Sequence, residues 1–545
     1  MVCSNRLLCI PEKSEARSIR SALRAFYGMR WRYLDFRDLL LEFRHLIHCI
    51  KSCIEITAFM VYTIIALHLK SVREKRDCMT IITKIIESVY YFLWGDWIRL
   101  PLPGGGTLTL PLLAVLLVPA GIFFTLRTRF VQLRLLPDMV RSLTEKDGGA
   151  RKEEGELSGL QALIASTAAR VGMGNLVGVV AAISAGGAGA LFWMWLTALL
   201  GAATAFVEAT LAQLHKQRDP LYGGWRGGPA YYIHDWVNAR RRGKPRKSVL
   251  AVLFAVSGLI CWCGISQVIS NSVTASFQNA FHIPPLWTTV VLVALAAVIV
   301  LRKNATVRVL DVLVPVMAGI YLLLTLVLIA LNFRQLGSVF VRIFAEAFGL
   351  RQVVAGGFGA VLMNGIKRGL FSNEAGSGSA PCAAATAETD HPAKVGLTQA
   401  MGVFIDTILC TCTALIMLSA PAELVDGLEG MALLQMAMQW HLGSFGSVFI
   451  AVILWLFSFT TFIGILFYAR SNVAYLFGDR WAAQTGYKIL ALIMLFVGGL
   501  AAYHIVWDLG DVGVGLMTVF NLIALVPLSR QAVDSLRDYE SRRNH

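Results

Sequence analysis

The sequence predicts an all-α integral membrane protein, and three observations support this fold class. Hydrophobic residues make up 56% of the 545 residues and charged residues only 15%, too few charges to cover the surface of a soluble protein. Apolar runs of about 18 residues or more, long enough to cross a bilayer, recur along the chain. The runs lack the alternation of a β-barrel, so we expect helices, which satisfy their own backbone hydrogen bonds in lipid.

We predict about eleven membrane spans, all of which follow residue 107. They extend over residues 108–126, 160–183, 190–213, 249–273, 286–302, 309–332, 353–371, 396–420, 446–468, 486–504 and 512–529.

The charges of the loops indicate how these spans are oriented. Basic residues gather in alternate loops, with seven Lys and Arg in 127–155 and nine in 214–248, whereas 184–189, 419–445 and 505–511 contain none. The other basic loops carry Arg302, Lys303 and Arg308, then Lys367, Arg368 and Lys394, then Arg470, Arg480 and Lys488. The loop 333–351, with three Arg, is the exception. Since cytoplasmic loops carry the excess of basic residues, we expect a multi-pass protein of the cell (inner) membrane with a cytoplasmic C-terminus.

The two ends of the chain differ from the span region. Residues 1–78 hold 14 of the 49 Lys and Arg and five of the ten Cys, without the apolar core of a signal peptide. Two interpretations are open: a genuine extension, or a start assigned too early, with Met79 as the first residue, and we favour the second. The domains expected after this segment are a transmembrane domain over 79–530 and a cytoplasmic tail over 531–545.

The positions of the basic residues, which give a net charge of +15, and of the cysteines indicate neither a nucleic-acid-binding protein nor a zinc protein. The basic residues lie beside apolar spans rather than in an aromatic-interleaved module, so no nucleic-acid partner is expected. The cysteine pairs Cys261/Cys263 and Cys410/Cys412 lie within apolar spans and lack zinc-site spacing, so they behave as small buried hydrophobes.

The span 160–183 contains a predicted helix break. It includes RVGMGNLVG, where Gly172 to Asn175 weaken the helix at mid-membrane. Backbone groups exposed there are tolerated only where they line a cavity or bind something, such as a carboxylate or Na⁺. A glycine-rich packing face between helices is the other interpretation, and the spacing alone leaves both open.

The span 353–371 shows the same signature, with Gly356, Gly357 and Gly359 followed by GIKRGLFSNEAGSGSAP. Two interrupted spans that lie five spans apart fit an inverted repeat of five plus five helices, preceded by the additional span 108–126. The helix after each interruption carries an acid in similar surroundings, Glu208 in FVEATL and Asp406 in FIDTIL.

Intramembrane polar residues are the remaining candidates for function. Arg170, Glu208 and Asp406 lie in or near apolar spans, where an ionisable group is costly unless it is paired or hydrated. For Arg170 we favour structural pairing inside the bundle, for instance with an acid. Ser458, Thr460 and Thr461 form a hydroxyl cluster that suits Na⁺, although hydroxyls bonded to their own helix explain it equally.

At these residues a family resemblance emerges. The runs STAARVGMGNLVGV, GALFWMWLTALLGAATAFVEATLA, GGPAYYI and GIKRGLFSNEAGSGSAPCAAATAETDHPAKVGLTQAMGVFIDT resemble the alanine or glycine:cation symporter family, also called sodium:alanine symporters. The resemblance covers roughly residues 80–530. It implies the LeuT-type five-plus-five inverted repeat and import of alanine or glycine coupled to Na⁺, more rarely to H⁺.

The resemblance also implies site residues. The substrate contacts it implies are Gly172, Met173, Gly174, Asn175, Gln267, Phe358 and Val361, the last two as an apolar wall that limits side-chain size. The sodium ligands it implies are carbonyls near Ala168 and Val171 with the hydroxyls of Thr460 and Thr461. The chain departs from the family at Met173, where many members have Thr, and at Ile269, where Gln267 and Asn271 stand near the family's Gln.

We therefore predict a secondary active transporter that imports a small neutral amino acid, alanine or possibly glycine, with sodium by alternating access through the lipid bilayer. A non-transporting amino-acid sensor of the same fold and a proton-coupled carrier are the alternatives. An intramembrane enzyme is disfavoured because no acid–base or metal motif such as HExxH is present, and no catalytic residue is predicted.

Overall fold

The computed structural model describes residues 84–101, 107–144, 157, 159–241, 246–301, 305–348, 358–425, 427–501 and 503–543. The chain divides into two compact units, Met1–Lys75 and Arg76–His545. The first unit, and with it most of the extension expected at 1–78, lies outside the described residues.

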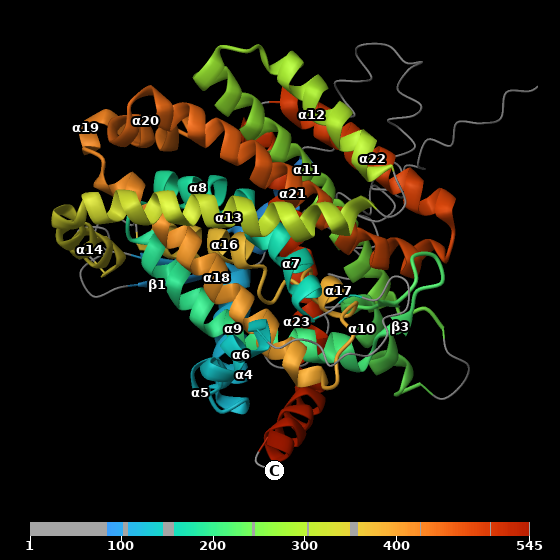
Figure 1. Cartoon of the computed structure of the whole chain (residues 1–545). Helices are drawn as coiled ribbons and strands as arrows, with labels where there is room; N and C mark the ends of the chain where they lie inside the picture. Colours follow the sequence, from blue (N-terminus) through green and yellow to red (C-terminus); the bar gives the residue numbers. More distant parts are fainter. Residues whose placement is uncertain are drawn as a thin grey trace, which may run out of the picture. The chain divides into compact units, whose positions relative to one another are not determined.

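Helices form nearly all of the described chain, as the composition predicts (Figure 1). The helices up to residue 300 are α4 (Leu112–Arg127), α5 (Val131–Arg134), α6 (Leu136–Thr144), α7 (Gly159–Arg170), η1 (Met173–Asn175), α8 (Val177–Gly186), α9 (Ala190–Leu214), α10 (Pro229–Asn238), α11 (Val249–Phe281) and α12 (Pro285–Val300). The later helices are α13 (Ala305–Leu331), α14 (Phe333–Phe348), α16 (Phe358–Asn373), α17 (Pro381–Ala384), α18 (Pro392–Ser419), α19 (Ala422–Val425), α20 (Met431–Leu442), α21 (Ser444–Phe477), α22 (Trp481–Leu500) and α23 (Tyr503–Arg543).

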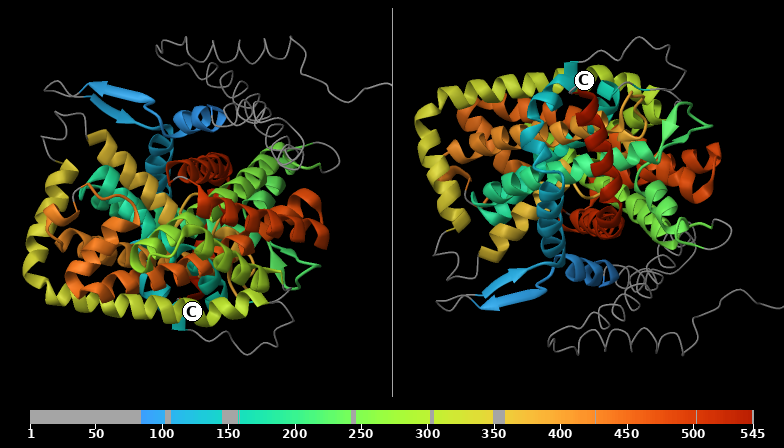
Figure 2. Two further views of the ribbon diagram at one scale, coloured as in Figure 1. Left: turned by 90° about the horizontal axis from the view of Figure 1, so that it is seen from above. Right: turned by 90° about the horizontal axis from the view of Figure 1, so that it is seen from below.

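Two short antiparallel hairpins complete the described secondary structure. β1 (Ile98–Pro101) pairs with β2 (Thr107–Leu110) in the register Ile98 to Leu110, and this hairpin projects beside the helices (Figure 2). β3 (Gln217–Arg218) pairs with β4 (Trp225–Arg226) directly after α9.

Seven described helices are long and apolar enough to cross a membrane: α9, α11, α13, α18, α21, α22 and α23. Shorter apolar helices cover Leu112–Arg127, Met173–Gly186 and Pro285–Val300. These seven helices make the chain a multi-pass membrane protein, while the number of eleven spans stays a prediction. α13 has an exposed apolar face that includes Leu323 and Leu331, as expected of a helix that faces lipid.

Two groups of helices pack closely. α9 lies against α16 and α18, and α11 lies against α21, α22 and α23. The first interrupted span joins them, because α8 contacts α16 while α7 contacts α21. This arrangement places the first interrupted span between the two groups.

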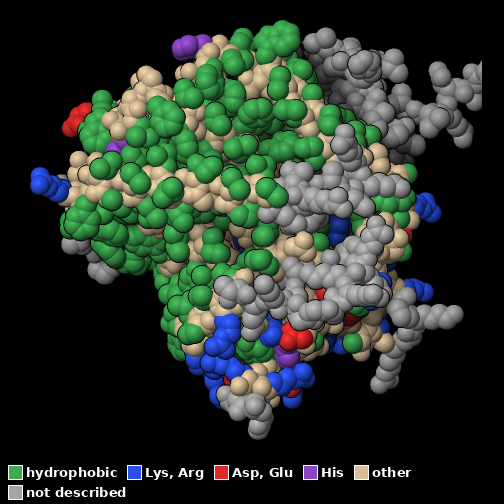
Figure 3. Space-filling view, in the orientation of Figure 1, with side chains coloured by type: hydrophobic (Ala, Val, Ile, Leu, Met, Phe, Trp, Pro, Cys, Tyr) green, Lys and Arg blue, Asp and Glu red, His purple; other side chains and the backbone are tan. Residues whose placement is uncertain are grey.

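Several predicted loops are helical. The exceptional loop 333–351 is mostly the amphipathic helix α14, and α20 lies within 419–445. α23 continues past the predicted end at residue 529 to Arg543. Hydrophobic side chains cover much of the face in Figure 3, and Lys and Arg gather at its lower end, where α5, α6 and the end of α23 lie.

The assignment of Lys367 and Arg368 to a basic loop is wrong. Both lie inside α16 and are buried, where Asp511 of α23 pairs with Lys367 at 2.5 Å and with Arg368 at 3.3 Å. The Arg368 guanidinium also lies 3.9 Å from the centre of the Trp507 ring. A charge count along the sequence cannot distinguish such a buried cluster from a cytoplasmic loop, because the compensating acid lies over 140 residues away.

We expect Asp511→Asn to destabilise the protein strongly, because it leaves two buried cations without their anion. Breaking a buried ion pair from one side costs about 3–5 kcal/mol. The apparent unfolding temperature of the purified protein should fall well below that of Asp534→Asn, a matched change in an exposed pair of α23. Equal unfolding temperatures for the two variants would show that the cluster contributes little.

Candidate functional site

The first interrupted span breaks where the sequence predicts. α7 ends at Arg170, Met173–Asn175 form a single 3₁₀ turn, and α8 begins at Val177. The Asn175 side chain supplies a hydrogen-bond acceptor to the backbone at the break: its Oδ1 accepts a hydrogen bond from the Gly172 N–H at 2.9 Å. Both Met173 and Asn175 are buried. The helix is thus truly broken, and a packing face alone does not explain this glycine pattern.

The described interruption of the second span falls within the run GIKRGLFSNEAGSGSAP that the sequence singles out. Gly356 and Gly357 fall outside the described residues, and Gly359 lies in the first turn of α16. The helix instead ends at Asn373, and residues 374–380 are irregular before the short helix α17. Gly376 and Gly378 adopt φ values of +95° and +82° there, which glycine adopts without the steric cost of a Cβ atom.

Asp406 of α18 links the two interrupted spans. Its Oδ1 accepts a hydrogen bond from Asn175 Nδ2 at 2.7 Å and another from Ser372 Oγ at 2.8 Å. The spans also approach closely here, since a Cβ atom at Gly174 would lie only 3.2 Å from the Ser372 Cα. Asn175, Ser372 and Asp406 therefore form a polar link across the first break, which we call the Asp406 link.

A small cavity lies beside this link, between α9, α16 and α18. Asp406 is part of its wall together with Leu191, Met194, Trp195, Gly369, Asn373, Thr407 and Cys410. A carboxylate in the wall of so small a cavity can hold a cation or an ammonium group.

Four buried ionisable groups surround the two breaks: Arg170, Glu208, Glu374 and Asp406. In the part of the chain that the structure describes, none of them is in an ion pair. The sequence predicts that Arg170 pairs with an acid, but the structure shows another partner. Its Nη1 donates to the backbone oxygen of Gln399 at 3.0 Å and to Gln399 Oε1 at 3.2 Å. The carboxylates are held by neutral donors, for example Glu374 by the Tyr468 hydroxyl at 3.2 Å.

The hydroxyl cluster of α21 reaches the first break through Thr461. Thr460 and Thr461 both donate to the Phe457 carbonyl, at 2.9 and 2.8 Å, as the structural interpretation expects. Thr461 Oγ1 also accepts a hydrogen bond from the Met173 N–H at 3.2 Å. Thr461 thus contacts the break, whereas Thr460 approaches Met317 of α13. The buried Ser458 hydroxyl has no hydrogen-bond partner within the described ranges.

Of the remaining predicted residues, Ala168 and Val171 lie beside the first break, whereas Gln267 and Val361 lie away from it. Val171 is buried just after α7, and Ala168 lies within α7. Gln267 lies against α22, where its Nε2 approaches Met494 Sδ at 3.2 Å. Val361 packs near Gly186 at the far end of α8, and the side chain of Phe358 lies outside the described residues. The structure therefore does not bring Gln267 or Val361 to the break.

Sequence reasoning missed Ser372, Glu374 and the Phe457 carbonyl. The first two stand in SNEAGSGS, where polar residues and glycines interrupt an apolar span, so a local signal existed. A backbone carbonyl carries no signal in the sequence.

Comparisons with known proteins agree with the resemblance. The family model described as the sodium:alanine symporter family matches residues 104–545. The chain is 42% identical to the "Probable sodium/glutamine symporter GlnT" of Bacillus subtilis over 78% of this chain and 87% of that protein. It is 34% identical to the "Sodium/alanine symporter AgcS" of Methanococcus maripaludis over 84% of this chain and 98% of that protein.

The fold of the chain is similar to that of a solved structure. The crystal structure of MhsT in complex with L-phenylalanine superposes with a TM-score of 0.51 at 13% identity, covering 70% of this chain and 89% of that chain. This likeness confirms the LeuT-type fold and carries no information on cargo.

We expect Asp406→Ala to lower the unfolding temperature more than Cys410→Ala does. The first change removes the acceptor that Asn175 and Ser372 share and leaves two buried donors without it, at about 1–3 kcal/mol each. The second removes a thiol that the same two donors contact more weakly, at 3.2 Å. If both variants unfold at one temperature, the Asp406 link does not hold the break together.

Proposed function

Because this chain belongs to the sodium:alanine symporter family, we propose that it imports a small neutral amino acid, alanine or glycine, together with Na⁺ by alternating access. Cation-coupled amino-acid transport is the activity named for both the Bacillus subtilis and the Methanococcus maripaludis relative described above. Symport requires no covalent chemistry, so we assign no catalytic residue. We further propose that the protein lies in the cell (inner) membrane with its C-terminus in the cytoplasm, since the basic end of α23 favours that side.

The observation that carries the proposal is the convergence of Thr461 with the first break. Na⁺ is a hard cation that takes several oxygen ligands, and unwound carbonyls with neighbouring hydroxyls supply them. We propose that the hydroxyls of Thr460 and Thr461 hold Na⁺ with carbonyls of Ala168 and Val171. The contact from Met173 N–H to Thr461 Oγ1 supports this, because it joins α21 to the unwound segment.

For the amino acid we propose a site at Gly172–Asn175 that extends to the Asp406 link. The positive N-terminal end of α8 suits the substrate carboxylate, and the Asp406 carboxylate suits a positive charge. The close approach of Gly174 to Ser372 leaves little room, which favours a small side chain. Gln267 and Val361 are left out of the proposed site because they lie away from the break.

Glutamine is a second candidate substrate, favoured by the 42% identity to a relative named for it. A relative named as a "Putative sodium/proton-dependent alanine carrier protein" also keeps proton coupling as an alternative. Uptake of labelled alanine into proteoliposomes, with and without an inward Na⁺ gradient, tests the proposal. Na⁺-dependent accumulation that excess glutamine does not inhibit supports it. Binding without accumulation under either a Na⁺ or an H⁺ gradient would indicate a sensor.

We expect Thr461→Ala to raise the Na⁺ concentration needed for half-maximal uptake, by roughly three- to tenfold for one lost ligand. Thr518→Ala is the matched control, because that buried hydroxyl donates only to Val514 of its own helix, α23. A Na⁺ dependence equal to that of the control variant would remove Thr461 from the ion site.

A further inference from the structure

The irregular segment 374–380 has backbone groups that no helix satisfies, and two side chains from other helices take their place. The Gly376 N–H donates to Glu208 Oε2 of α9 at 3.2 Å. The Gly376 carbonyl accepts a hydrogen bond from Asn521 Nδ2 of α23 at 3.0 Å. The same amide nitrogen donates to Glu208 Oε1, and the Tyr232 hydroxyl of α10 donates to Asn521 Oδ1. Glu208 and Asn521 thus satisfy both backbone groups of one residue.

The Glu208 carboxylate is unusual in its surroundings. It is completely buried in a stretch of α9 rich in small apolar residues, and no described cation lies within ion-pair distance. Both of its oxygens accept hydrogen bonds from N–H donors, which is the pattern of an ionised carboxylate. A buried charge held only by neutral donors is costly, so a smaller neutral residue would suit simple packing better.

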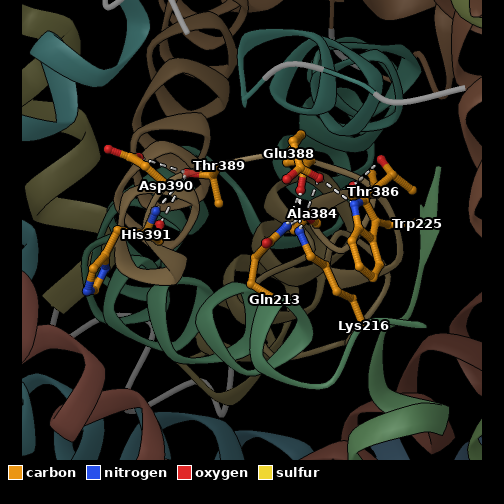
Figure 4. Close-up of polar contacts among 11 residues, drawn as sticks. Gln213, Lys216, Trp225, Ala384, Thr386, Glu388, Thr389, Asp390 and His391 are labelled. Atoms are coloured by element: carbon orange, nitrogen blue, oxygen red, sulfur yellow. Dashed lines mark hydrogen bonds and ion pairs between the residues drawn. The ribbon is translucent and has the colours of Figure 1, made fainter. Parts of the chain in front are cut away.

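Gln213 of α9 and Lys216, which lies just after that helix, hold the chain at the end of α17. Gln213 Nε2 donates to the carbonyls of Ala384 at 2.5 Å and Ala387 at 3.0 Å, and Lys216 Nζ donates to Ala387 at 2.8 Å. Figure 4 shows Gln213 and Lys216 pointing toward Ala384 and Glu388. α9 therefore contacts the chain at two points: Glu208 contacts the irregular segment 374–380, and Gln213 contacts the end of α17.

Gly376 is close in sequence to the residues that meet the first break. Ser372 is part of the Asp406 link, and Glu374 Oε2 shares the single Tyr468 hydroxyl proton with the Ser166 carbonyl of α7, at 3.2 and 2.9 Å. A shift of Gly376 would therefore move the chain on which both contacts depend.

We propose that Glu208 is a positioning residue for the cargo site: its carboxylate fixes Gly376 and thereby sets Ser372 and Glu374 against the first break. This inference rests on the proposed transport function. Gln213, in contrast, fixes the end of α17, which lies outside the proposed cargo site. The two residues of α9 should thus affect different steps, affinity for Glu208 and turnover for Gln213.

The test compares Glu208→Gln with Gln213→Ala in proteoliposome uptake. The amide of Glu208→Gln retains an acceptor for Gly376, but its nitrogen then faces Asn521 Nδ2, donor against donor. We expect the KM for the amino acid to rise roughly tenfold or more, as for a lost hydrogen bond to a charged group. Gln213→Ala should lower kcat and leave KM within about twofold, since it frees backbone carbonyls outside the site.

A compensating variant separates positioning from general damage. Adding Asn521→Asp to Glu208→Gln gives the new amide nitrogen an acceptor and restores one negative charge, while it removes the donor to the Gly376 carbonyl. Recovery of part of the lost affinity in this double variant supports the proposal, because the link between the two side chains is what it restores. An unchanged KM in Glu208→Gln overturns it.

Two further measurements keep the test decisive. If Glu208→Gln does not yield folded protein, Asn521→Ala removes the donor to Glu208 and Gly376 from the other side, and the same rise in KM is expected. Uptake by the unchanged chain is measured first, because its absence would refute the proposed function alone. The Glu208 inference would then be tested by binding: the Kd of alanine in the presence of Na⁺ should be roughly tenfold higher for Glu208→Gln than for the unchanged chain.

Discussion

The structure depends on one constraint: a backbone group removed from water must find a partner, and a broken helix in a membrane leaves several without one. The second break is satisfied by side chains from other helices, and the first by its own Asn175, which another helix holds in turn. Asn175 closes the first break onto Gly172 and is itself held by Asp406, while Glu208 and Asn521 hold Gly376 in the second. The helices α9, α18 and α23 are thus tied to the two breaks by hydrogen bonds as well as by packing.

Sequence reasoning located the first break because Gly172, Gly174 and Asn175 stand together within one apolar run. It did not tell which glycine of the second run marks the break, because glycine is ambiguous: Gly359 lies inside α16, whereas Gly376 adopts a positive φ. Composition and run length predicted the helical membrane fold correctly. The amphipathic helix α14 and the buried Lys367 were assigned to loops, because charge in sequence does not reveal a partner brought near by folding.

The candidate site was predictable where side chains carry the chemistry and not where the backbone does. Thr461 was identified from its hydroxyl, but its contact with Met173 N–H required the fold. Gln267 was chosen for its polarity and its nearness to a family position, yet α11 turns it toward Met494. On a helix, a shift of one or two positions rotates a side chain by 100° or 200°, so a residue near the expected position can face the opposite side.

The buried charges give the proposed coupling a physical basis. Around the two breaks, three carboxylates share the interior with the guanidinium of Arg170, and Gln399 rather than an acid binds that guanidinium. If the carboxylates are ionised, this region carries excess negative charge that neutral donors only partly offset. A cation that enters beside Thr461 reduces the excess, while the amino acid, a zwitterion, leaves the sum unchanged. In the proposed mechanism, binding of the ion would favour close packing of the two interrupted spans, and a substrate that binds the same packing would then bind cooperatively with the ion.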